Sequence, residues 1–509
     1  MALTRAVKAG FVTAAVTLAV GMLALNQALV GVFYDDGLYA SLASAVASGY
    51  GYVHPNLPGM PGGVHFPPVY PIVLAPVFGL LPVPAAALAA KILNALLAAA
   101  AAGLIAWHAL RTELLGPGLP RWVPAAVVTA AAIAIPVLAT QTVLFAEPLF
   151  GLLVAIVIVL VDSLPAFPLS TEWRGGQAVR AGIVAALALL TRSIGIAVVI
   201  GTVCFLLARR PPLRVWSALL LPPVIAFLAW GIWVATHAGR IDPALALVYG
   251  TYGAPLREAG FSAISGNVRD LSRPLEVLAF GWITFRPLYV LLATAALAVG
   301  LYGLFLVSRR SAIGWSLIFY LLILAVWPYP PDRFIWVILP WLALTWAAGA
   351  AELWRRWPSP RARILVGLLA ALGAGGYLRY EFQGFKGWWW DSQARAISAN
   401  FAELLPVVQN LPDTAIVATD DEALVWLYTR RRAVPLYLES YRGRELIRPT
   451  PAEHRAYFER MGVTHVLLAS ATSPSAIELR SLLGAYPSWL TAIYRWSDGR
   501  WLFALNRGQ

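Results

Sequence analysis

The chain has 509 residues, of which 60% are hydrophobic and only 12% are charged, and its mean hydropathy is +0.71. Soluble globular proteins carry about twice this share of charged residues, so the composition excludes an ordinary soluble domain and predicts a polytopic membrane protein. The net charge of +13 would suggest nucleic-acid binding in a soluble protein. Here the basic residues gather at the ends of apolar runs, which excludes nucleic acid as the expected partner. The single cysteine, Cys204, excludes an internal disulfide and a cysteine metal cluster.

The first predicted element is an apolar stretch at 9–33, which follows Arg5 and Lys8. It is too long for the apolar region of a signal peptide and no small-residue cleavage site follows, so we expect a retained transmembrane helix. In all we expect about 11 transmembrane helices. They are predicted at 9–33, 84–110, 122–138, 147–165, 178–191, 194–208, 214–236, 286–307, 312–327, 334–352 and 363–378. The pair around Arg192 leaves one long helix open as an alternative.

Basic residues occupy alternate connecting segments, and the positive-inside rule uses this asymmetry to assign orientation. With a cytoplasmic N-terminus, the following residues fall on the inner side: Arg5, Lys8, Arg111, Arg121, Arg174, Arg180, Arg209, Arg210, Arg214, Arg309, Arg310, Arg355, Arg356, Arg361 and Arg363. The sequence therefore predicts a multi-pass protein of the cytoplasmic (inner or plasma) membrane whose C-terminal region is extracytoplasmic.

Two long connections fall on the outer side within the predicted transmembrane domain, 1–378. They are the outer loops 34–83 and 237–285. The first contains a predicted helix at 36–48 and an apolar segment at 68–81. That segment is too short to span a bilayer before the following prolines, so we expect an interfacial helix.

The terminal region, 379–509, has the composition of a soluble domain. "TAIVATD", "THVLLAS" and "RWLFALN" read as short strands, and helical patterns lie near 421–431 and 451–461. This alternation predicts a small extracytoplasmic α/β domain attached to a mainly α membrane protein. No Gly-rich phosphate motif follows either of the first two strands, which favours a lid or docking surface over independent catalysis.

Three acids are predicted on the outer side, close to the membrane surface. Asp35 and Asp36 follow the first predicted helix, and Glu147 opens the predicted helix 147–165. Helix N-capping would explain any one of them. Three acids at one depth, without a lysine or arginine within several residues, favour a catalytic role. Such carboxylates can act as a general base or hold a divalent cation that neutralises a phosphate leaving group.

Two arginines, Arg192 and Arg333, lie between apolar runs at the predicted outer boundary. The guanidinium group matches phosphate geometry, so both are candidate phosphate ligands; snorkelling to the interface is the alternative. His65 shares the first loop with the aspartates and is a candidate phosphate contact. Together with Asp36 it is also a candidate ligand for Mg²⁺, Mn²⁺ or Zn²⁺, although the histidines as a group lack metal-ligand spacing.

Five segments in this order resemble motifs of the C-type (GT-C) integral-membrane glycosyltransferases. They are "YDDGLYA", "FPPVYP", "AEPLF", "LALLTRSIGI" and "PDRFIWVILPWLAL", the last followed by a soluble outer domain. The resemblance is greatest to the protein O-mannosyltransferase branch, which includes the bacterial lipid A aminoarabinose transferases. It covers nearly the whole chain.

This resemblance implies that a sugar is transferred from a polyprenyl-phosphate donor to a lipid, glycan or protein acceptor on the outer face, with inversion. By position, Asp35 matches the family's first loop acid, usually the base, and Asp36 matches the second acid. Tyr70 of the Pro-Pro-x-Tyr element joins the phosphate-contact candidates. The aminoarabinose branch has a lysine where this chain has Phe66, so that branch's particular substrate is not implied.

Two other functions stay open from the sequence. One is a transporter or flippase of a lipid-linked saccharide, and the other is a polymerase of lipid-linked oligosaccharides. Transporters often contain internal repeats and charges near the bilayer midplane. This chain shows no such repeat and its acids lie at the predicted outer boundary, which favours the glycosyltransferase.

Overall fold

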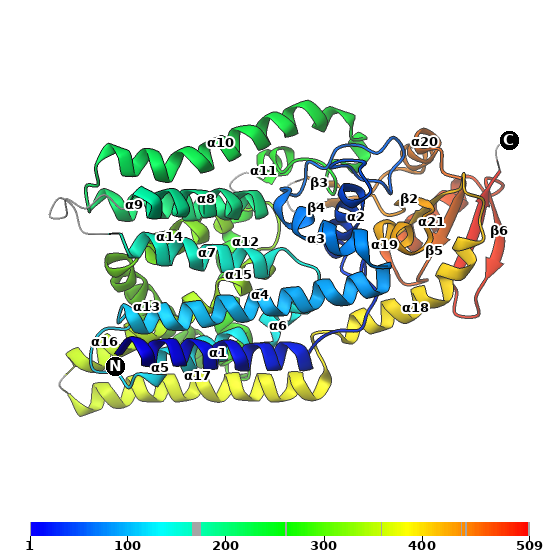
Figure 1. Ribbon diagram of the computed structural model, residues 1–509. Coiled ribbons are helices and arrows are strands. Elements are labelled where there is room, and N and C mark those ends of the chain that lie inside the picture. Colours follow the sequence, from blue (N-terminus) through cyan, green and yellow to red (C-terminus); the bar gives the residue numbers. More distant parts are fainter. Residues whose placement is uncertain are drawn as a thin grey trace. The chain divides into compact units, whose positions relative to one another are not determined.

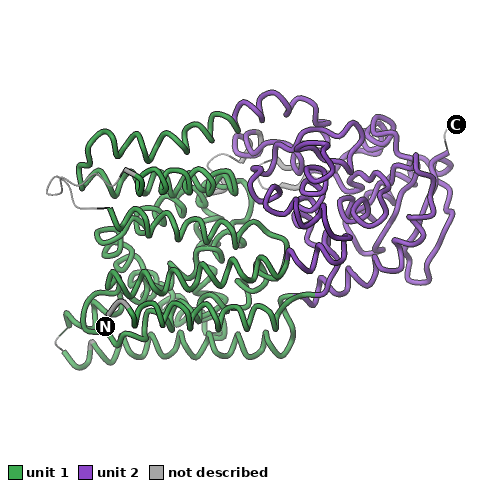
Figure 2. The backbone as a smooth tube through the Cα atoms, viewed as in Figure 1, with its two compact units in different colours: residues 1–26, 91–230, 261–390 green, residues 27–90, 231–260, 391–509 purple. Residues whose placement is uncertain are grey.

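The computed structural model describes residues 2–164, 175–259, 262–357, 359–438, 440–442 and 445–506. They form two compact units (Figure 2). Unit 1 consists of residues 1–26, 91–230 and 261–390, and unit 2 consists of residues 27–90, 231–260 and 391–509. The predicted outer loop 34–83 therefore belongs entirely to the same unit as the C-terminal region, and the second outer loop is divided between the units.

Unit 1 is built of helices, many of which run side by side (Figure 1). They are α1 (Ala2–Leu23), most of α4 (Val83–Arg111), α5 (Trp122–Ala132), α6 (Ile135–Gln141), α7 (Glu147–Asp162), α8 (Gly175–Thr191), α9 (Ile196–Leu207), most of α10 (Leu213–His237), α12 (Ser262–Asp270), η4 (Leu275–Phe280), α13 (Arg286–Arg310), α14 (Ala312–Ala325), α15 (Asp332–Val337), α16 (Leu339–Arg356) and α17 (Pro360–Gly387). Four helices of the described chain are long and apolar enough to cross a membrane. The pair α5 and α6, bent by 65°, would make a fifth. The protein is thus a multi-pass membrane protein, while the expected count of about 11 spans is not reached by this criterion.

The first helix ends at Leu23 rather than near residue 33. Beyond it, the Lys91 ammonium donates to the backbone carbonyl and the side-chain oxygen of Asn26, at 3.0 Å each. Both acceptor oxygens belong to Asn26, which lies just beyond the end of the helix. The segment that leads to the two aspartates is therefore irregular, and Asp35 does not directly follow a transmembrane helix.

The alternative of one long helix through Arg192 is wrong. Arg192 has extended backbone angles (φ −147°, ψ 130°) and separates α8 from α9. At the turn between them, a Cβ on Gly195 would lie 2.9 Å from backbone atoms of Ala188. The chain therefore needs glycine there, and the break exposes the Arg192 side chain to partners from other helices.

Helix α7 places acids at its two ends. Its 16 residues make it about 24 Å long. At the far end, Asp162 accepts hydrogen bonds from the backbone N–H of Ala312 at 2.8 Å and from the Ser311 hydroxyl, and lies 2.9 Å from His108 Nε2. This cluster ties α4, α7 and the start of α14 together at the end of α7 opposite to Glu147.

Unit 2 contains a five-stranded sheet of order β2-β1-β5-β7-β6. Its strands are β1 (Ile416–Thr419), β2 (Arg432–Pro435), β5 (His465–Leu468), β6 (Leu490–Arg495) and β7 (Trp501–Leu505); β3 (Ser440–Arg442) and β4 (Glu445–Ile447) form a separate pair. Strands β2, β1 and β5 are parallel, and β7 is antiparallel to β5 and β6. The strands expected from "TAIVATD", "THVLLAS" and "RWLFALN" are β1, β5 and β7, and the two expected helices are α19 and α20.

The helices of unit 2 come from all three of its chain segments. They are α2 (Asp35–Ala47), α3 (Val69–Leu80), α11 (Gly253–Ala259), α18 (Ser392–Gln409), α19 (Glu422–Thr429), α20 (Pro451–Met461) and α21 (Pro474–Ala485). The apolar segment 68–81 is thus helical as expected, and its interfacial position stays a prediction. The predicted transmembrane helix 363–378 is longer than expected, because α17 continues to Gly387.

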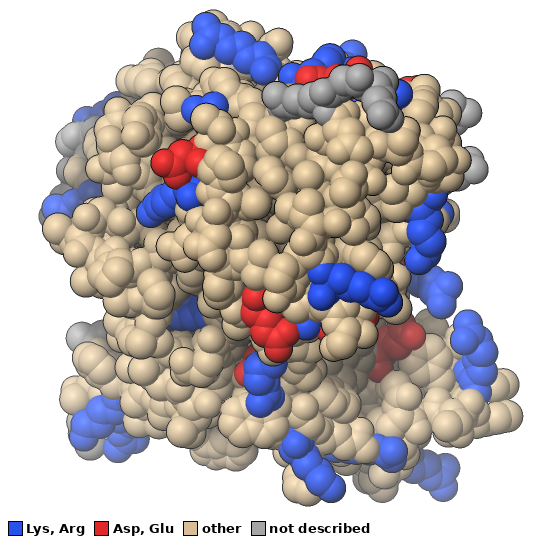
Figure 3. Space-filling view, turned by 90° about the vertical axis from the view of Figure 1, so that its right-hand side faces the viewer, with Lys and Arg blue, Asp and Glu red and all other residues tan. Residues whose placement is uncertain are grey.

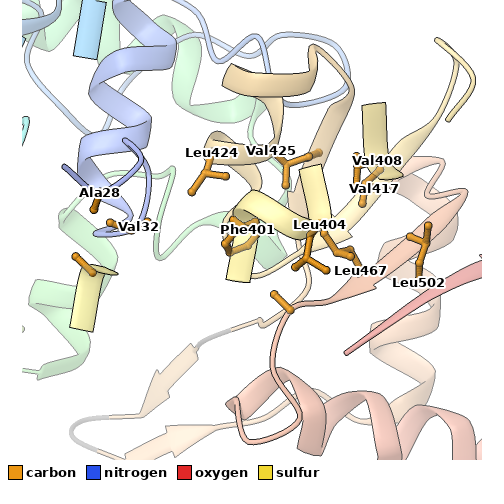
Figure 4. Packing of buried hydrophobic residues seen from close by; sticks show 13 residues of the cluster. Ala28, Val32, Phe401, Leu404, Val408, Val417, Leu424, Val425, Leu467 and Leu502 are labelled. Carbon is orange, nitrogen blue, oxygen red and sulfur yellow. The ribbon is translucent and has the colours of Figure 1, made fainter. Parts of the chain in front are cut away.

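The core of unit 2 joins the first outer loop to the α/β sheet (Figure 4). Ala28 and Val32, which precede the two aspartates, pack in one buried cluster with Phe401 of α18, Val417 of β1 and Leu424 of α19. The segment that carries Asp35 and Asp36 is therefore fixed by the C-terminal region of the chain.

Candidate active site

In unit 1, Glu147 forms ion pairs with both predicted arginines. Its Oε1 lies 2.8 Å from Arg192 Nη1 and 2.9 Å from Arg333 Nε. Glu147 is 2% exposed, whereas the Arg333 side chain is 30% exposed. Residues from three separate segments of the chain therefore meet at the first residue of α7. Two guanidinium groups gathered on one carboxylate are a candidate site for an anion, because guanidinium donors match phosphate and carboxylate geometry.

Aromatic rings hold the two arginines. The Arg192 guanidinium lies 4.5 Å from the ring centre of Phe334, and the Arg333 guanidinium lies 4.5 Å from that of Phe145. The Phe334 carbonyl accepts a hydrogen bond from Tyr320 at 3.0 Å. Stacking on a ring favours the guanidinium plane over a flexible ammonium, so these positions select arginine.

Lys91 is a buried cation of unit 1 that the sequence analysis missed. It is 4% exposed and binds Asn26. One turn further along α4, the Asn94 amide donates to the carbonyls of Val143 (2.6 Å) and Phe145 (3.0 Å). The same face of α4 therefore supports the loop whose Phe145 packs on Arg333. A lysine inside the apolar run 84–110 was the available signal, because such charges are costly within membrane helices.

In unit 2, Asp36 has a structural set of contacts. Its carboxylate accepts hydrogen bonds from the backbone N–H groups of Gly31 (2.9 Å), Phe33 (3.1 Å) and Gly37 (2.9 Å), and the residue is 1% exposed. Three donors to one carboxylate stabilise the local backbone. The N-capping alternative is wrong for both aspartates, because α2 begins at Asp35 and its N-cap residue is Tyr34. The contacts of Asp36 instead join the irregular segment to the first turn of α2.

Asp35 is partly exposed and follows an unusual backbone conformation. Tyr34 has φ 64° and ψ −72°, and the Asp35 N–H donates to the Phe33 carbonyl at 2.8 Å. These features define a γ-turn with a positive φ, which is rare and strained for a bulky residue. Asp35 is therefore the less buried of the two acids and lies directly after a strained turn.

The phenol of Tyr34 donates to Glu422 Oε1 at 2.7 Å. The phenol of Tyr249, from the second outer loop, donates to the same oxygen, and Asn56 donates to the Tyr249 oxygen at 2.9 Å. Glu422 itself is fully buried at the start of α19. This network was not anticipated, although the run "DDE" directly after the buried strand β1 was a visible signal for it.

Burial dominates the electrostatics of this acidic run. It raises the pKa of Glu422 to about 7, against the opposing effect of the hydrogen bonds from Tyr249 and Tyr34. Burial also raises the pKa of Asp420 to about 6. The pKa of Asp421 is raised well above its ordinary value by burial and, in addition, by the nearby acids Asp420, Glu422 and Asp36. On the face shown in Figure 3, by contrast, Lys and Arg side chains outnumber acids.

His65 and Tyr70 also lie in unit 2. His65 Nδ1 is 2.8 Å from the Gly250 carbonyl, and its ring centre is 4.4 Å from that of Tyr252. Tyr70 is fully buried and packs edge-on against Tyr39 at 5.0 Å. Both residues therefore anchor the first loop, His65 to the second outer loop and Tyr70 to α2; their phosphate contacts stay predictions.

The contacts of Asp36 and His65 do not fit a shared metal ion. Both carboxylate oxygens of Asp36 accept backbone hydrogen bonds, and one ring nitrogen of His65 binds a carbonyl. Among the described residues, no group of three His, Cys, Asp or Glu side chains is arranged to hold a metal. The expected divalent cation stays a prediction.

A cavity of about 630 Å³ lies within unit 2. Its walls come from the second outer loop, including Gly250, and from the C-terminal region, including Arg448 and Arg460. Asp242 pairs with Arg460 at 3.0 Å. The volume is in the range of small-ligand sites, and the carbonyl that anchors His65 belongs to a residue of its lining.

No protein-family model matches this chain, and no curated protein matches its sequence. Its structure is similar to the apo structure of ArnT from Cupriavidus metallidurans, with a TM-score of 0.52, 16% identity and 97% of each chain covered. It is also similar to the apo oligosaccharyltransferase from Archaeoglobus fulgidus, with a TM-score of 0.55, 13% identity, and 99% of this chain and 74% of that chain covered. The archaeal AglB in complex with an inhibitory peptide and a dolichol-phosphate gives a TM-score of 0.53 at 13% identity, covering 98% of this chain and 74% of that one. The resemblance drawn from the five sequence motifs is thus confirmed at the level of the fold: this chain has the C-type glycosyltransferase fold.

Proposed function

We propose that this protein is a membrane glycosyltransferase that transfers a sugar from a polyprenyl-phosphate donor to an acceptor on the extracytoplasmic face. The observation that carries the proposal is the convergence of Arg192 and Arg333 on buried Glu147. Guanidinium groups match the geometry of phosphate, so this pair of arginines suits a lipid phosphate as ligand. A structural neighbour, AglB, is bound to dolichol-phosphate, which supports the same class of donor.

In the proposed reaction, the bond between the anomeric carbon and the phosphate oxygen breaks while a bond to the acceptor forms on the opposite face, with inversion. Asp35 accepts the proton of the acceptor as general base. Arg192 and Arg333 stabilise the negative charge that collects on the leaving polyprenyl phosphate. Asp36 keeps the first loop in shape, and Glu147 aligns the two arginines.

The partners and the orientation follow from the same proposal. The acceptor is a lipid, glycan or protein, and the cavity lined by Gly250 and Arg448 is a candidate site for it. The N-terminus would be cytoplasmic and the region 379–509 extracytoplasmic in the cytoplasmic membrane. The positive-inside pattern of the sequence supports this orientation.

The test uses purified full-length protein in lipid nanodiscs and a panel of radiolabelled polyprenyl-phosphate sugars. Release of polyprenyl phosphate should depend on an added acceptor mixture, and Asp35→Asn should remove that release. Asp413→Asn, at an exposed acid of unit 2 that pairs with Arg431, is the matched control. Movement of the intact lipid-linked sugar across vesicles without bond cleavage would instead identify a flippase, and joining of two lipid-linked glycans would identify a polymerase.

A further inference from the structure

The backbone turn before Asp35 is strained and needs a restraint. Tyr34 has φ 64°, and its turn is closed by the Asp35 N–H on the Phe33 carbonyl. Strained backbone of this kind persists only where surrounding contacts determine it, and it collects at functional sites. The contacts that hold Tyr34 therefore also set the direction in which α2 and the Asp35 side chain begin.

Helix α19 supplies those contacts. Glu422 Oε1 accepts a hydrogen bond from the Tyr34 phenol at 2.7 Å. Gly31, at φ 109°, lies so close to Leu424 that an added Cβ would collide with it, and a Cβ on Gly37 would lie 3.0 Å from the Ala423 side chain. The segment 31–37 thus lies on the first turn of α19. Gly31 is required by its positive φ and by close approach, and Gly37 by close approach alone.

Glu422 is suited to fix this segment because its carboxylate accepts hydrogen bonds from two different loops. Its Oε1 accepts from Tyr34 of the first loop and from Tyr249 of the second loop, while its own backbone begins a helix of the C-terminal region. Its other oxygen, Oε2, is buried and has no hydrogen-bond partner in the described structure. Full burial of a carboxyl group costs folding free energy unless its hydrogen bonds compensate for the lost hydration.

We propose that Glu422 is a positioning residue which, through the Tyr34 phenol, holds the turn that directs Asp35. This inference rests on the proposed function for the role of Asp35 as base. It assigns to the C-terminal region a direct part in shaping the site, beyond that of a lid. Loss of the Glu422 contact lets the turn relax and moves Asp35, and a displacement of about 1 Å costs about 100-fold in rate.

The kinetic test compares Tyr34→Phe, Glu422→Leu and Glu422→Gln in the full-length protein. Tyr34→Phe and Glu422→Leu should each lower kcat by about 10- to 100-fold, with the KM for the lipid donor changed by less than about 2-fold because neither residue binds it. Glu422→Gln keeps a carbonyl acceptor for the phenol and should therefore retain most of the wild-type kcat. The double variant Tyr34→Phe with Glu422→Leu should be no worse than Glu422→Leu alone, since both remove one contact.

Tyr457→Phe is the matched control, because Tyr457 is a buried tyrosine of the same unit whose phenol donates to the Pro435 carbonyl at 3.2 Å. It should leave kcat unchanged. An unchanged kcat in Tyr34→Phe and Glu422→Leu would overturn the proposal, and so would an equal loss in Tyr457→Phe.

A second measurement does not depend on activity. Hydrogen–deuterium exchange should show faster exchange of the amides of residues 31–37 in Tyr34→Phe and Glu422→Leu, and wild-type exchange in Glu422→Gln and Tyr457→Phe. Unchanged protection of this segment would overturn the inference even if kcat fell. If the wild-type protein transfers no sugar from any donor, the proposed function fails, while the exchange of residues 31–37 still decides whether Glu422 holds the turn.

Discussion

The Tyr34 phenol and the Glu422 carboxylate form a 2.7 Å hydrogen bond across 388 positions of the chain. Tyr34 belongs to the first outer loop, and Glu422 opens the first helix after strand β1. The bond connects a strained turn to a buried acid whose pKa is raised to about 7. The protonation state of this acid and the order of the first loop are therefore linked.

Stability of unit 2 should fall as the pH rises from about 4.5 to about 7. Below this window both the folded and the unfolded chain hold the Glu422 proton, and above it both are ionised. Between these limits only the folded state holds it, because its pKa is raised, so the free energy of unfolding falls by roughly 3 kcal/mol. Asp420, with a pKa of about 6, contributes with the same sign. Thermal unfolding at pH 5 and pH 8 measures the effect.

Glu422→Gln is the diagnostic variant for this pH dependence. It should be less sensitive to pH than the wild type and more stable relative to it at pH 8 than at pH 5. Glu459→Gln, at an acid paired with Arg455 on the surface of α20, should behave like the wild type. Equal pH dependence of stability in the wild type and Glu422→Gln would show that Glu422 has the same pKa in the folded and the unfolded chain.

Asp35→Asn should lower the rate of sugar transfer by at least about 100-fold, because a general base contributes this much or more. The fold should be retained, since Asp35 is partly exposed and its isosteric amide fits the same space. Single-turnover transfer measures the rate, and thermal unfolding checks the fold. Near-normal transfer by a well-folded Asp35→Asn protein would remove the central claim.

Asp36→Ala should act on stability first. Three backbone N–H groups lose their acceptor in a buried site, which costs about 2–4 kcal/mol of unfolding free energy. Thermal unfolding should show a clear decrease for Asp36→Ala and little change for Asp413→Ala, whose side chain is 91% exposed. If Asp36→Ala unfolds like the wild type yet loses transfer, Asp36 acts on the reaction directly.

Arg333→Ala should weaken binding of polyprenyl phosphate by about 10- to 100-fold, the range expected for a lost charged hydrogen bond. The fold should tolerate the change, because Glu147 keeps its 2.8 Å pair with Arg192. Competition of polyprenyl phosphate with a fluorescent lipid phosphate measures the affinity. Arg355→Ala, at another arginine that pairs with an acid of unit 1, is the control; equal affinity in both variants would exclude Arg333 from the phosphate site.

Much of the fold could be predicted from the sequence, since it depends on local patterns. The short apolar runs bounded by polar residues correspond to β1, β5 and β7, and the predicted helix 36–48 corresponds to α2, Asp35–Ala47. The end of the first helix was placed too late, at 33 instead of Leu23. Apolarity alone continues past Leu23, whereas Asn26, just beyond the end of the helix, binds Lys91 from another helix, a contact that the local sequence does not reveal.

The sequence by itself determined the membrane class of the protein and the residues Asp35, Glu147, Arg192 and Arg333 as candidates, because apolarity and misplaced charge are local properties. Only the tertiary structure decided how they are used. It gave Asp36 three backbone donors, paired Glu147 with two arginines from distant segments and brought Glu422 to Tyr34. A carboxylate's role depends on the donors and charges around it, and those are set by which segments the fold brings together.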